Sequence, residues 1–376
     1  MKTNSIELVD CITAMKELPD NSIDMVCTDP PYFLDGLGDD WDKEKIDKKG
    51  SSSMVGNLPK GMKFDRKQSK KFSEFYRKVS DEVFRVLKPG GAFISFSSPR
   101  LYHSMTMAVE ESGFEIRDML AWIYTQSQVK AFTQNHIIEN DKKKTREEKD
   151  KLKELCKDWR TPQLKPSIEP MCLAVKPIEK RYIDNFEKYG TGLMNTSDET
   201  KAGGKFPSNI MTTQDELFNG IFLVPKPGKK EKSEFNTHLS VKPVELVEHL
   251  IRLFTTENAV VLDPFMGSGT TAVAAVSCNR QYLGYDINQE YIDISKKRVA
   301  SQMEPKWTWY PTNNQQSTLK MSFDDQPVYK IGDAFTMRNI LNIVDKMNTA
   351  MPHYEFEPEP VCEGGIRVKQ DGRGYK

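Results

Sequence analysis

One tetrapeptide of the sequence, Asp29-Pro30-Pro31-Tyr32, carries the groups needed to hold an exocyclic amino group of a planar base. The Asp29 carboxylate and the Pro30 carbonyl can accept its two N–H bonds, which favours the geometry that points the nitrogen lone pair outward for attack. The prolines fix two backbone angles and remove two donors, and Tyr32 offers a flat face for stacking. An ordinary turn capped by its Asp would show the same letters.

The residues before this tetrapeptide, 23–28, form a short apolar run that predicts a buried strand. In open parallel sheets, ligands bind outside the carboxyl ends of the strands. We therefore expect Asp29 to face a cleft at that edge of a sheet.

A second stretch, 260–271, predicts a strand, a glycine-bearing turn and the start of a helix, which together bring backbone N–H groups close to a nucleoside-type ligand. About twenty residues after the glycines, a second predicted strand ends in Asp286, at the place where ribose hydroxyls are usually bound. The ligand-binding candidates of this stretch are Asp263, Phe265, Gly267, Ser268, Gly269, Thr270 and Asp286.

The two stretches together resemble the β class of DNA amino-methyltransferases, in which a catalytic Asp-Pro-Pro-Tyr precedes a Phe-x-Gly-x-Gly motif for S-adenosyl-L-methionine. The resemblance runs from about Ser5 to about Arg298. It implies a circularly permuted chain, with the catalytic half first, a target-recognition region next and the cofactor half last. It also implies double-stranded DNA as substrate, with the target base flipped out to reach Asp29, Pro30, Pro31 and Tyr32.

The resemblance adds three cofactor-binding candidates. Asp10 ends the first predicted strand, and its family counterpart contacts the adenine of the cofactor. His238 and Lys242 stand in a His-x-x-x-Lys-Pro pattern that in the family wraps the methionine end. Other interpretations stay open, because an Asp at Asp10 also suits a helix cap and an isolated histidine is more often structural.

The predicted fold is α/β, a Rossmann-like doubly wound methyltransferase sheet that is circularly permuted and carries an inserted target-recognition region. Strands and helices alternate over the first part of the chain, as such a sheet requires. The predicted elements there are a helix from Phe72, ended by Lys88-Pro89-Gly90-Gly91, a strand at 92–96, a helix at 101–112 and a strand at 114–124. In the permuted order, the N-terminal strand would lie beside the strand that ends at Asp286.

We expect four segments. They are the catalytic half at 1–124, the target-recognition region at 125–237 with a framework strand near 164–177, the cofactor half at 238–300, and a C-terminal extension at 301–376. The extension has no assigned role, and residues 336–347 predict a helix within it.

DNA contacts must be local, because 54 basic and 54 acidic residues give a formal net charge of zero. Two lysine-rich segments are candidates, and solvated loops would look the same. The DNA-binding candidates in them are Lys67, Lys70, Lys229 and Lys230. The resemblance adds Trp41 as a candidate for the target pocket, because some relatives carry a similar Gly-x-x-Trp-Asp after the catalytic motif, and a plain surface aromatic stays the alternative. A third run, 142–146, lies among acidic residues and favours a solvated arm or contact element over a phosphate clamp.

Six scattered cysteines without a Cys-x-x-Cys pair predict reduced thiols and no metal site. The N-terminus lacks an apolar signal core, and no apolar run approaches membrane-spanning length. We expect a soluble, cytoplasmic protein with no membrane partner.

The predicted activity is site-specific transfer of a methyl group to N6 of adenine, because Asp at the first motif position is typical of the adenine enzymes and Ser of the cytosine-N4 enzymes. Cytosine-N4 methylation stays an alternative, since some of those enzymes carry the same tetrapeptide. An RNA methyltransferase and a catalytically inert DNA-binding protein are the further alternatives. A cognate restriction endonuclease and a homodimer are the partners we consider.

Overall fold

The computed structural model describes residues 1–32, 66–124, 131–162, 164–197, 206–212, 222–224, 226–227, 235–236, 241–303, 306–310, 318–323, 326–327, 354–359 and 365–370. The chain forms two compact units, Met1–Val299 and Ala300–Lys376.

In the described part of the first unit, nine strands form one sheet in the order β1-β9-β8-β2-β3-β5-β4-β6-β7. The strands are β1 (Ser5–Leu8), β2 (Ile23–Thr28), β3 (Leu87–Phe96), β4 (Glu115–Ile123), β5 (Ile168–Val175), β6 (Ile210–Thr212), β7 (Phe222–Leu223), β8 (Val260–Asp263) and β9 (Gln281–Asp286). Strands from all three predicted segments of this unit therefore share a single sheet.

The sheet is parallel except for β5, which runs antiparallel to both of its neighbours, β3 and β4. Chain order reverses between β8 and β2, because β8, β9 and β1 follow one another to one side and β2 and β3 to the other. Such a reversal is the point at which ligands bind in open α/β sheets. The predicted pairing of the N-terminal strand with the Asp286 strand is confirmed, since Leu8 is in register with Asp286.

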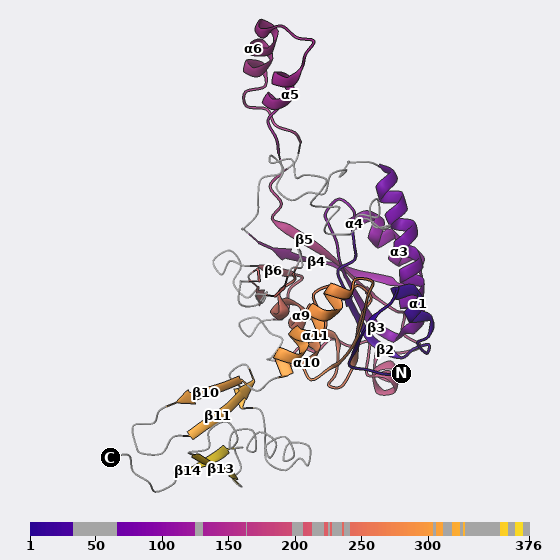
Figure 1. The fold of residues 1–376 in the computed structure, drawn as a ribbon. Helices are drawn as coiled ribbons and strands as arrows, with labels where there is room; N and C mark the ends of the chain where they lie inside the picture. Colours follow the sequence, from indigo (N-terminus) through magenta and orange to yellow (C-terminus); the bar gives the residue numbers. More distant parts are fainter. Residues whose placement is uncertain are drawn as a thin grey trace, which may run out of the picture. The chain divides into compact units, whose positions relative to one another are not determined.

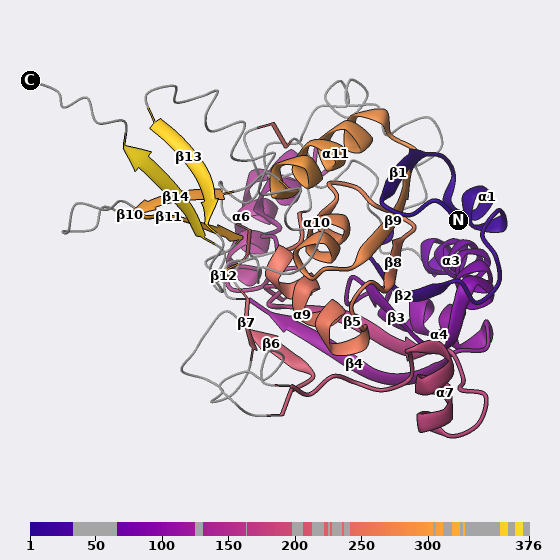
Figure 2. The same cartoon turned by 90° about the horizontal axis from the view of Figure 1, so that it is seen from below.

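Helices cover both faces of the sheet, so the fold has three layers, as Figures 1 and 2 show. One face packs against α1 (Cys11–Lys16), α3 (Arg66–Val86) and α4 (Tyr102–Glu111), and the other against α9 (Val244–Phe254), α10 (Thr270–Ser277) and α11 (Gln289–Met303). The predicted doubly wound α/β fold is confirmed.

The amphipathic spacing of α3 explains how one such helix attaches. Its apolar side chains recur every three or four positions, and Phe72, Tyr76, Val79 and Val83 are buried. The helix begins at Arg66, earlier than its apolar pattern does, because polar first turns need no core contact. Opposite it, every residue of β2 is buried, as its uninterrupted apolar run predicted.

One predicted turn is wrong. Residues 88–91 were expected to separate a helix from a strand, but β3 already begins at Leu87. Its pairing with β2 jumps from Ile23 with Leu87 to Met25 with Ala92, so the extra residues form an irregularity within the strand. The left-handed φ of 78° at Gly90 permits this backbone path.

The region predicted for target recognition contributes both framework and insertion. Its predicted framework strand is confirmed as β5. Two helices, α5 (Asn135–Asn140) and α6 (Arg146–Leu155), lie between β4 and β5 in the chain, and α7 (Tyr182–Tyr189) follows β5. Thr145 caps α6 in a reciprocal bond pair with Glu148.

The second unit contains an antiparallel sheet in its described residues, ordered β10-β11-β14-β13 with β12 on β11. These strands are β10 (Lys306–Tyr310), β11 (Thr318–Phe323), β12 (Gln326–Pro327), β13 (Tyr354–Glu359) and β14 (Gly365–Gln370). The helix predicted at 336–347 lies outside the described residues. Across the described parts of both units, no helix is both long and apolar enough to span a membrane.

Candidate active site

Three of the predicted carboxylates follow or end neighbouring parallel strands. Asp29 follows β2, Asp263 ends β8 and Asp286 ends β9. Because β2 pairs with β8 and β8 with β9 in parallel register, all three lie at the same edge of the sheet. The sheet thus brings the predicted catalytic stretch next to the predicted cofactor stretch.

Asp29 is half-buried, and side chains engage both of its carboxylate oxygens. The Tyr32 hydroxyl donates to Oδ1 and the Lys242 ammonium donates to Oδ2. Tyr32 also packs partly against the buried side chains of the neighbouring core. Burial, followed by the charges of Asp29 and Glu169, raises the pKa of the Tyr32 hydroxyl, so this phenol stays a neutral donor.

The sequence predicts that Lys242 wraps the cofactor, but the structure places its ammonium at the predicted catalytic motif. The Nζ atom lies between Asp29 and Glu169, 2.8 Å from Oε1 of Glu169, and 5.2 Å from the centre of the Phe96 ring. Burial opposes its charge, yet the two carboxylates more than offset this effect and the pKa of the amine is raised. Lys242 is therefore a buried, charged partner of Asp29, and its contact with cofactor stays a prediction.

Glu169 is a site residue that the sequence analysis did not single out. It lies on β5, opposite Trp122 of β4, and its side chain is only 18% exposed. Burial raises the pKa of its carboxyl, while Lys242 acts against that rise. The available signal was an acidic residue inside an otherwise apolar strand, which requires a charged partner.

Asp263 has a structural place in the site. Thr28 and Thr271 each donate a hydroxyl to its carboxylate at 2.6 Å, and the Phe265 N–H donates at 3.0 Å. These contacts join the end of β2, the end of β8 and the start of α10. Burial raises the Asp263 pKa to about 6, although the hydroxyl donors oppose the rise.

The glycine-bearing turn after β8 has the backbone that its sequence predicted. Gly267 and Gly269 have left-handed φ angles of 50° and 83°, which favour glycine. A side chain at Gly269 would meet Ser295 of α11 at 2.6 Å, so this glycine is also needed for helix packing. Asp286 accepts the Gly267 N–H at 2.9 Å, which ties the turn to the end of β9.

The hydroxyls of this turn make internal bonds. The buried Arg298 guanidinium donates to the carbonyl and hydroxyl of Ser268 and to the hydroxyl of Thr270. The Thr270 hydroxyl in turn reaches the Lys242 carbonyl at 3.3 Å. Phe265 is half-buried, and its ring lies 6.0 Å from that of Phe75. Ser268 and Thr270 thus hold the turn in shape, and their contact with cofactor stays a prediction.

Asp10 occupies the position that both of its interpretations require. Its Oδ1 accepts the Thr13 N–H and hydroxyl, each at 2.9 Å, and so caps α1. It also follows Val9, the residue directly after β1, whose N–H donates to the Asp286 carbonyl at 2.9 Å. The capping interpretation is confirmed, and a cofactor contact stays a prediction.

The DNA-binding candidates are mostly not placed. Trp41, Lys229 and Lys230 lie outside the described residues, as does the cofactor candidate His238. Lys67 is in α3, where only its backbone is described. The Lys70 side chain is 80% exposed, with its Nζ 3.9 Å from Glu74.

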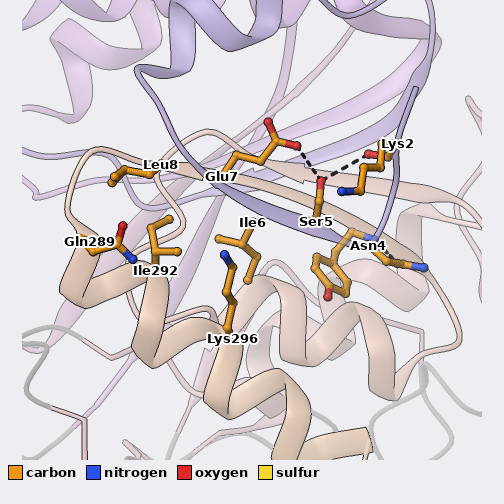
Figure 3. Close-up of a pocket in the computed structure, with 10 residues that line it drawn as sticks. Lys2, Asn4, Ser5, Ile6, Glu7, Leu8, Gln289, Ile292 and Lys296 are labelled. Atoms are coloured by element: carbon orange, nitrogen blue, oxygen red, sulfur yellow. Dashed lines mark hydrogen bonds between the residues drawn. The ribbon is translucent and has the colours of Figure 1, made fainter.

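A cavity of about 500 Å³ lies elsewhere, at the outer strand β1. Figure 3 shows Ile6, Leu8, Gln289, Ile292 and Lys296 around it, from β1 and α11. Its lining contains none of the predicted catalytic or cofactor residues. The predicted site residues lie instead at the carboxyl ends of β2, β8 and β9.

The Cys27 thiol, close to Asp29 in the chain, is not suited to act as a nucleophile. Cys27 is buried in β2, and burial raises the pKa of its thiol well above the ordinary value. In the described part of the chain, no group of three or more His, Cys, Asp or Glu side chains is arranged to hold a metal ion.

The class of protein follows from comparison with known families. Residues 23–297 match the DNA methylase family of N6/N4 methyltransferases, and the chain belongs to that family. Its members use S-adenosyl-L-methionine, so this is the cofactor of the chain, and DNA is its substrate.

Individual relatives cover most of the chain. The type II methyltransferase M.HindIII of Haemophilus influenzae is 29% identical over 77% of this chain and 93% of its own length. M.HpaI of Haemophilus parainfluenzae is 27% identical over 78% of this chain and 73% of its own. M.HinfI of Haemophilus influenzae is 23% identical over 93% of this chain and 81% of its own.

Solved structures of the same kind are more distant. The cytosine-N4-specific PvuII DNA methyltransferase aligns with a TM-score of 0.48 and 16% identity, over 84% of this chain and 88% of its own. M1.HpyAVI in complex with SAM aligns with a TM-score of 0.44 and 19% identity, over 78% of this chain and 98% of its own.

Proposed function

We propose that this DNA methyltransferase acts on N6 of adenine at a specific duplex site, with Asp29 as the residue that binds the reacting amino group. The observation that carries the proposal is the place of Asp29. It is a half-buried carboxylate at the end of β2, next to the strand that leads into the glycine-bearing turn. A carboxylate there can accept an N–H bond from a base brought to the edge of the sheet.

The residues after β8 and β9 fit a nucleoside cofactor. Two left-handed glycines leave positions 267 and 269 of the turn without side chains, and the half-buried Asp286 carboxylate lies beside it. Asp10 follows β1, the strand that pairs with β9. We assign Gly267, Gly269 and Asp286 to S-adenosyl-L-methionine, which supplies an electrophilic methyl group when bound.

Asp29 and the Pro30 carbonyl would prepare the nucleophile. The amino nitrogen of adenine is a poor nucleophile because its lone pair is delocalised into the ring. Two acceptors on its N–H bonds favour a pyramidal nitrogen, whose lone pair then points toward the methyl donor. Tyr32 would supply the stacking face for the flipped base. Transfer is then direct, with no protein nucleophile.

The choice of adenine rests on the first position of the motif. Asp29 stands where the adenine enzymes of the family typically have Asp and the cytosine-N4 enzymes more often have Ser. A carboxylate reaches further than a hydroxyl and needs different spacing to the amine. Residues 131–162, which follow β4 at the same edge, and residues 206–212 are our candidates for target recognition.

One experiment tests the proposal. Duplex DNA and, separately, RNA are incubated with the enzyme and labelled cofactor, digested to nucleosides and analysed by mass spectrometry. We expect N6-methyladenine from DNA alone. N4-methylcytosine would overturn the choice of base, and labelled RNA would overturn the choice of substrate. If neither nucleic acid received the label, the assigned chemistry would be wrong.

The relatives are type II methyltransferases, and we extend that setting to this chain by proposal. A cognate endonuclease would then cleave the same site when it is unmethylated. Protection of methylated DNA from nucleases of known specificity would identify the site. A homodimer stays a prediction, which sedimentation of the full chain would test.

A further inference from the structure

The site contains a lysine held between two carboxylates that come from distant parts of the chain. Lys242 precedes α9, Asp29 follows β2 and Glu169 is on β5. Lys242 donates to Oδ2 of Asp29, and its Nζ lies 2.8 Å from Oε1 of Glu169. We call this arrangement the Asp29–Lys242–Glu169 bridge.

The bridge is largely closed to solvent at its centre. Lys242 is 7% exposed, so its charge depends on the two carboxylates for compensation. Removing the Glu169 charge would leave Lys242 with Asp29 as its single anionic partner in the bridge. The two carboxylates therefore share one cation, and a change at Glu169 must be felt at Asp29.

Both Asp29 oxygens are engaged in this structure, by Tyr32 and by Lys242. Each carboxylate oxygen can accept more than one hydrogen bond, so Asp29 keeps acceptor capacity for an incoming amino group, and gains more if one of these donors withdraws. Lys242 is anchored a second time, by Glu169, and lies over the Phe96 ring. Of the two donors, Lys242 is thus the more firmly anchored, and Tyr32 is the one that can yield Oδ1 to a substrate.

We propose that Lys242 and Glu169 are positioning residues for methyl transfer, in which ionised Glu169 fixes Lys242, and Lys242 fixes Asp29 with Oδ1 toward the substrate amino group. The inference deepens the proposed function and rests on the catalytic role of Asp29. Glu169 need not touch substrate or cofactor to act in this way.

The charge state of Glu169 gives the inference a pH signature. The charged and titratable groups that act on Glu169 or respond to it are Lys242, Asp29, Lys226, Tyr32 and Tyr124. Burial, the largest influence, raises the Glu169 pKa. The bridge requires ionised Glu169. Activity should therefore fall on acidification, and the midpoint of this fall should lie above the pKa of an ordinary carboxyl group.

The test compares Glu169→Gln with Glu169→Asp by single-turnover kinetics across pH. We expect Glu169→Gln to lower the transfer rate between about 10-fold and about 100-fold, because small misplacements of a catalytic group have effects of that size. Its cofactor Kd and DNA KM should stay within about twofold of the parent's values. The fall in rate on acidification that we assign to Glu169 should disappear from its pH profile. Glu169→Asp, which keeps the charge, should restore part of the rate and the acidic limb.

A matched control is Glu179→Gln, which removes a surface glutamate paired with Lys188 at 2.7 Å. It should leave rate and pH profile unchanged. If Glu169→Gln had the rate and pH profile of the parent, the inference would be overturned. It would also be overturned if the rate fell together with the cofactor affinity or with the midpoint of unfolding. Asp29→Ala separates the two levels: if it is inactive while Glu169→Gln is normal, only the positioning role fails, whereas an active Asp29→Ala enzyme refutes the proposed function.

Discussion

Two neighbouring strands of the sheet lead into the same dipeptide, Asp29-Pro30 after β2 and Asp263-Pro264 at the end of β8. The two carboxylates nevertheless have different surroundings. Asp263 is 4% exposed and receives two hydroxyls and a backbone N–H from its immediate surroundings. The Asp29 side chain is 23% exposed, and its partners are the side chains of Tyr32 and Lys242.

The difference shows how one local motif can serve structure or chemistry. The donors to Asp263 come from the end of β2, the residue pair after β8 and the start of α10, so their bonds are part of the framework that joins these elements. Long side chains such as Tyr32 can rotate away from Asp29 and leave an oxygen for a substrate. We therefore assign Asp263 to the framework and Asp29 to the reaction, and the following experiments test that division.

The largest expected effect is on catalysis. Asp29→Ala should reduce methyl transfer by at least roughly 100-fold, because it removes an acceptor from the reacting amino group. Cofactor Kd by calorimetry should stay within about twofold. Glu257→Ala, which removes an exposed carboxylate between α9 and β8, is the control and should be fully active. Substantial residual turnover in Asp29→Ala would contradict the assigned role.

The turn that follows Asp263 should matter for binding. Gly267→Val should weaken cofactor binding by at least roughly 100-fold, since a β-branched side chain disfavours a φ of 50° and would stand where the ligand approaches the backbone. Asp286→Ala should weaken it less. Calorimetry measures both variants.

A control separates backbone strain from the loss of the site. Gly190 also has a left-handed φ, 72°, at the end of α7, and among the described residues a side chain there would meet Thr256 alone, at 3.5 Å. Gly190→Val should therefore lose stability but keep cofactor affinity. If Gly267→Val bound cofactor like the parent, the pocket would have to lie elsewhere.

The framework role of Asp263 predicts a pH effect on stability. Its folded-state pKa is raised from 3.8 to about 6, so its contribution to stability is complete only below about 3.8 and is lost as the pH rises through about 6. Asp263→Asn cannot ionise and keeps an acceptor oxygen for Thr28. Relative to the variant, the parent should lose roughly 2 kcal/mol of unfolding free energy between about pH 4.5 and about pH 7.5.

Denaturant unfolding of both proteins at the two pH values measures this difference. Asp158→Asn, at an exposed position, should track the parent. Parallel pH curves for the parent and Asp263→Asn would show that the carboxylate is not the source of the pH dependence.

The smallest expected effect concerns the segment inserted between β4 and β5, which contributes to neither Asp-Pro strand end. Its ends meet where the Thr161 N–H donates to the Phe132 carbonyl at 3.0 Å, so residues 133–160 can be replaced by a short glycine-serine linker. DNA KM should rise roughly tenfold and site preference should relax, since a module of this size offers several phosphate contacts. Cofactor Kd should not change. A folded linker variant that methylates the same sites with the parent's KM would exclude this segment from target recognition.

Much of the framework was accessible from local pattern. Local sequence predicts the strand from the apolar run of β2, the helix from the spacing of apolar residues in α3, and the turn from the glycines before α10. Each of these conformations is determined by residues that are close together in the chain. The start of β3 was missed because Pro89 and Gly90 read as a turn, whereas pairing with β2 and β5 keeps the chain extended around an irregularity. The cap at Asp10 was foreseen because capping is a contact within a few residues.

The sequence by itself determined the strands that carry the site, the two Asp-Pro ends, the glycine-bearing turn and, through their order, the family. Only the tertiary structure decided which Asp is fixed and which is open, and that Lys242 meets Asp29 across 213 positions of chain with Glu169 as its second partner. The physical reason is that a buried charge is defined by the groups around it. Those groups come from β2, β5 and the turn before α9, and the order of strands in the sheet brings them together.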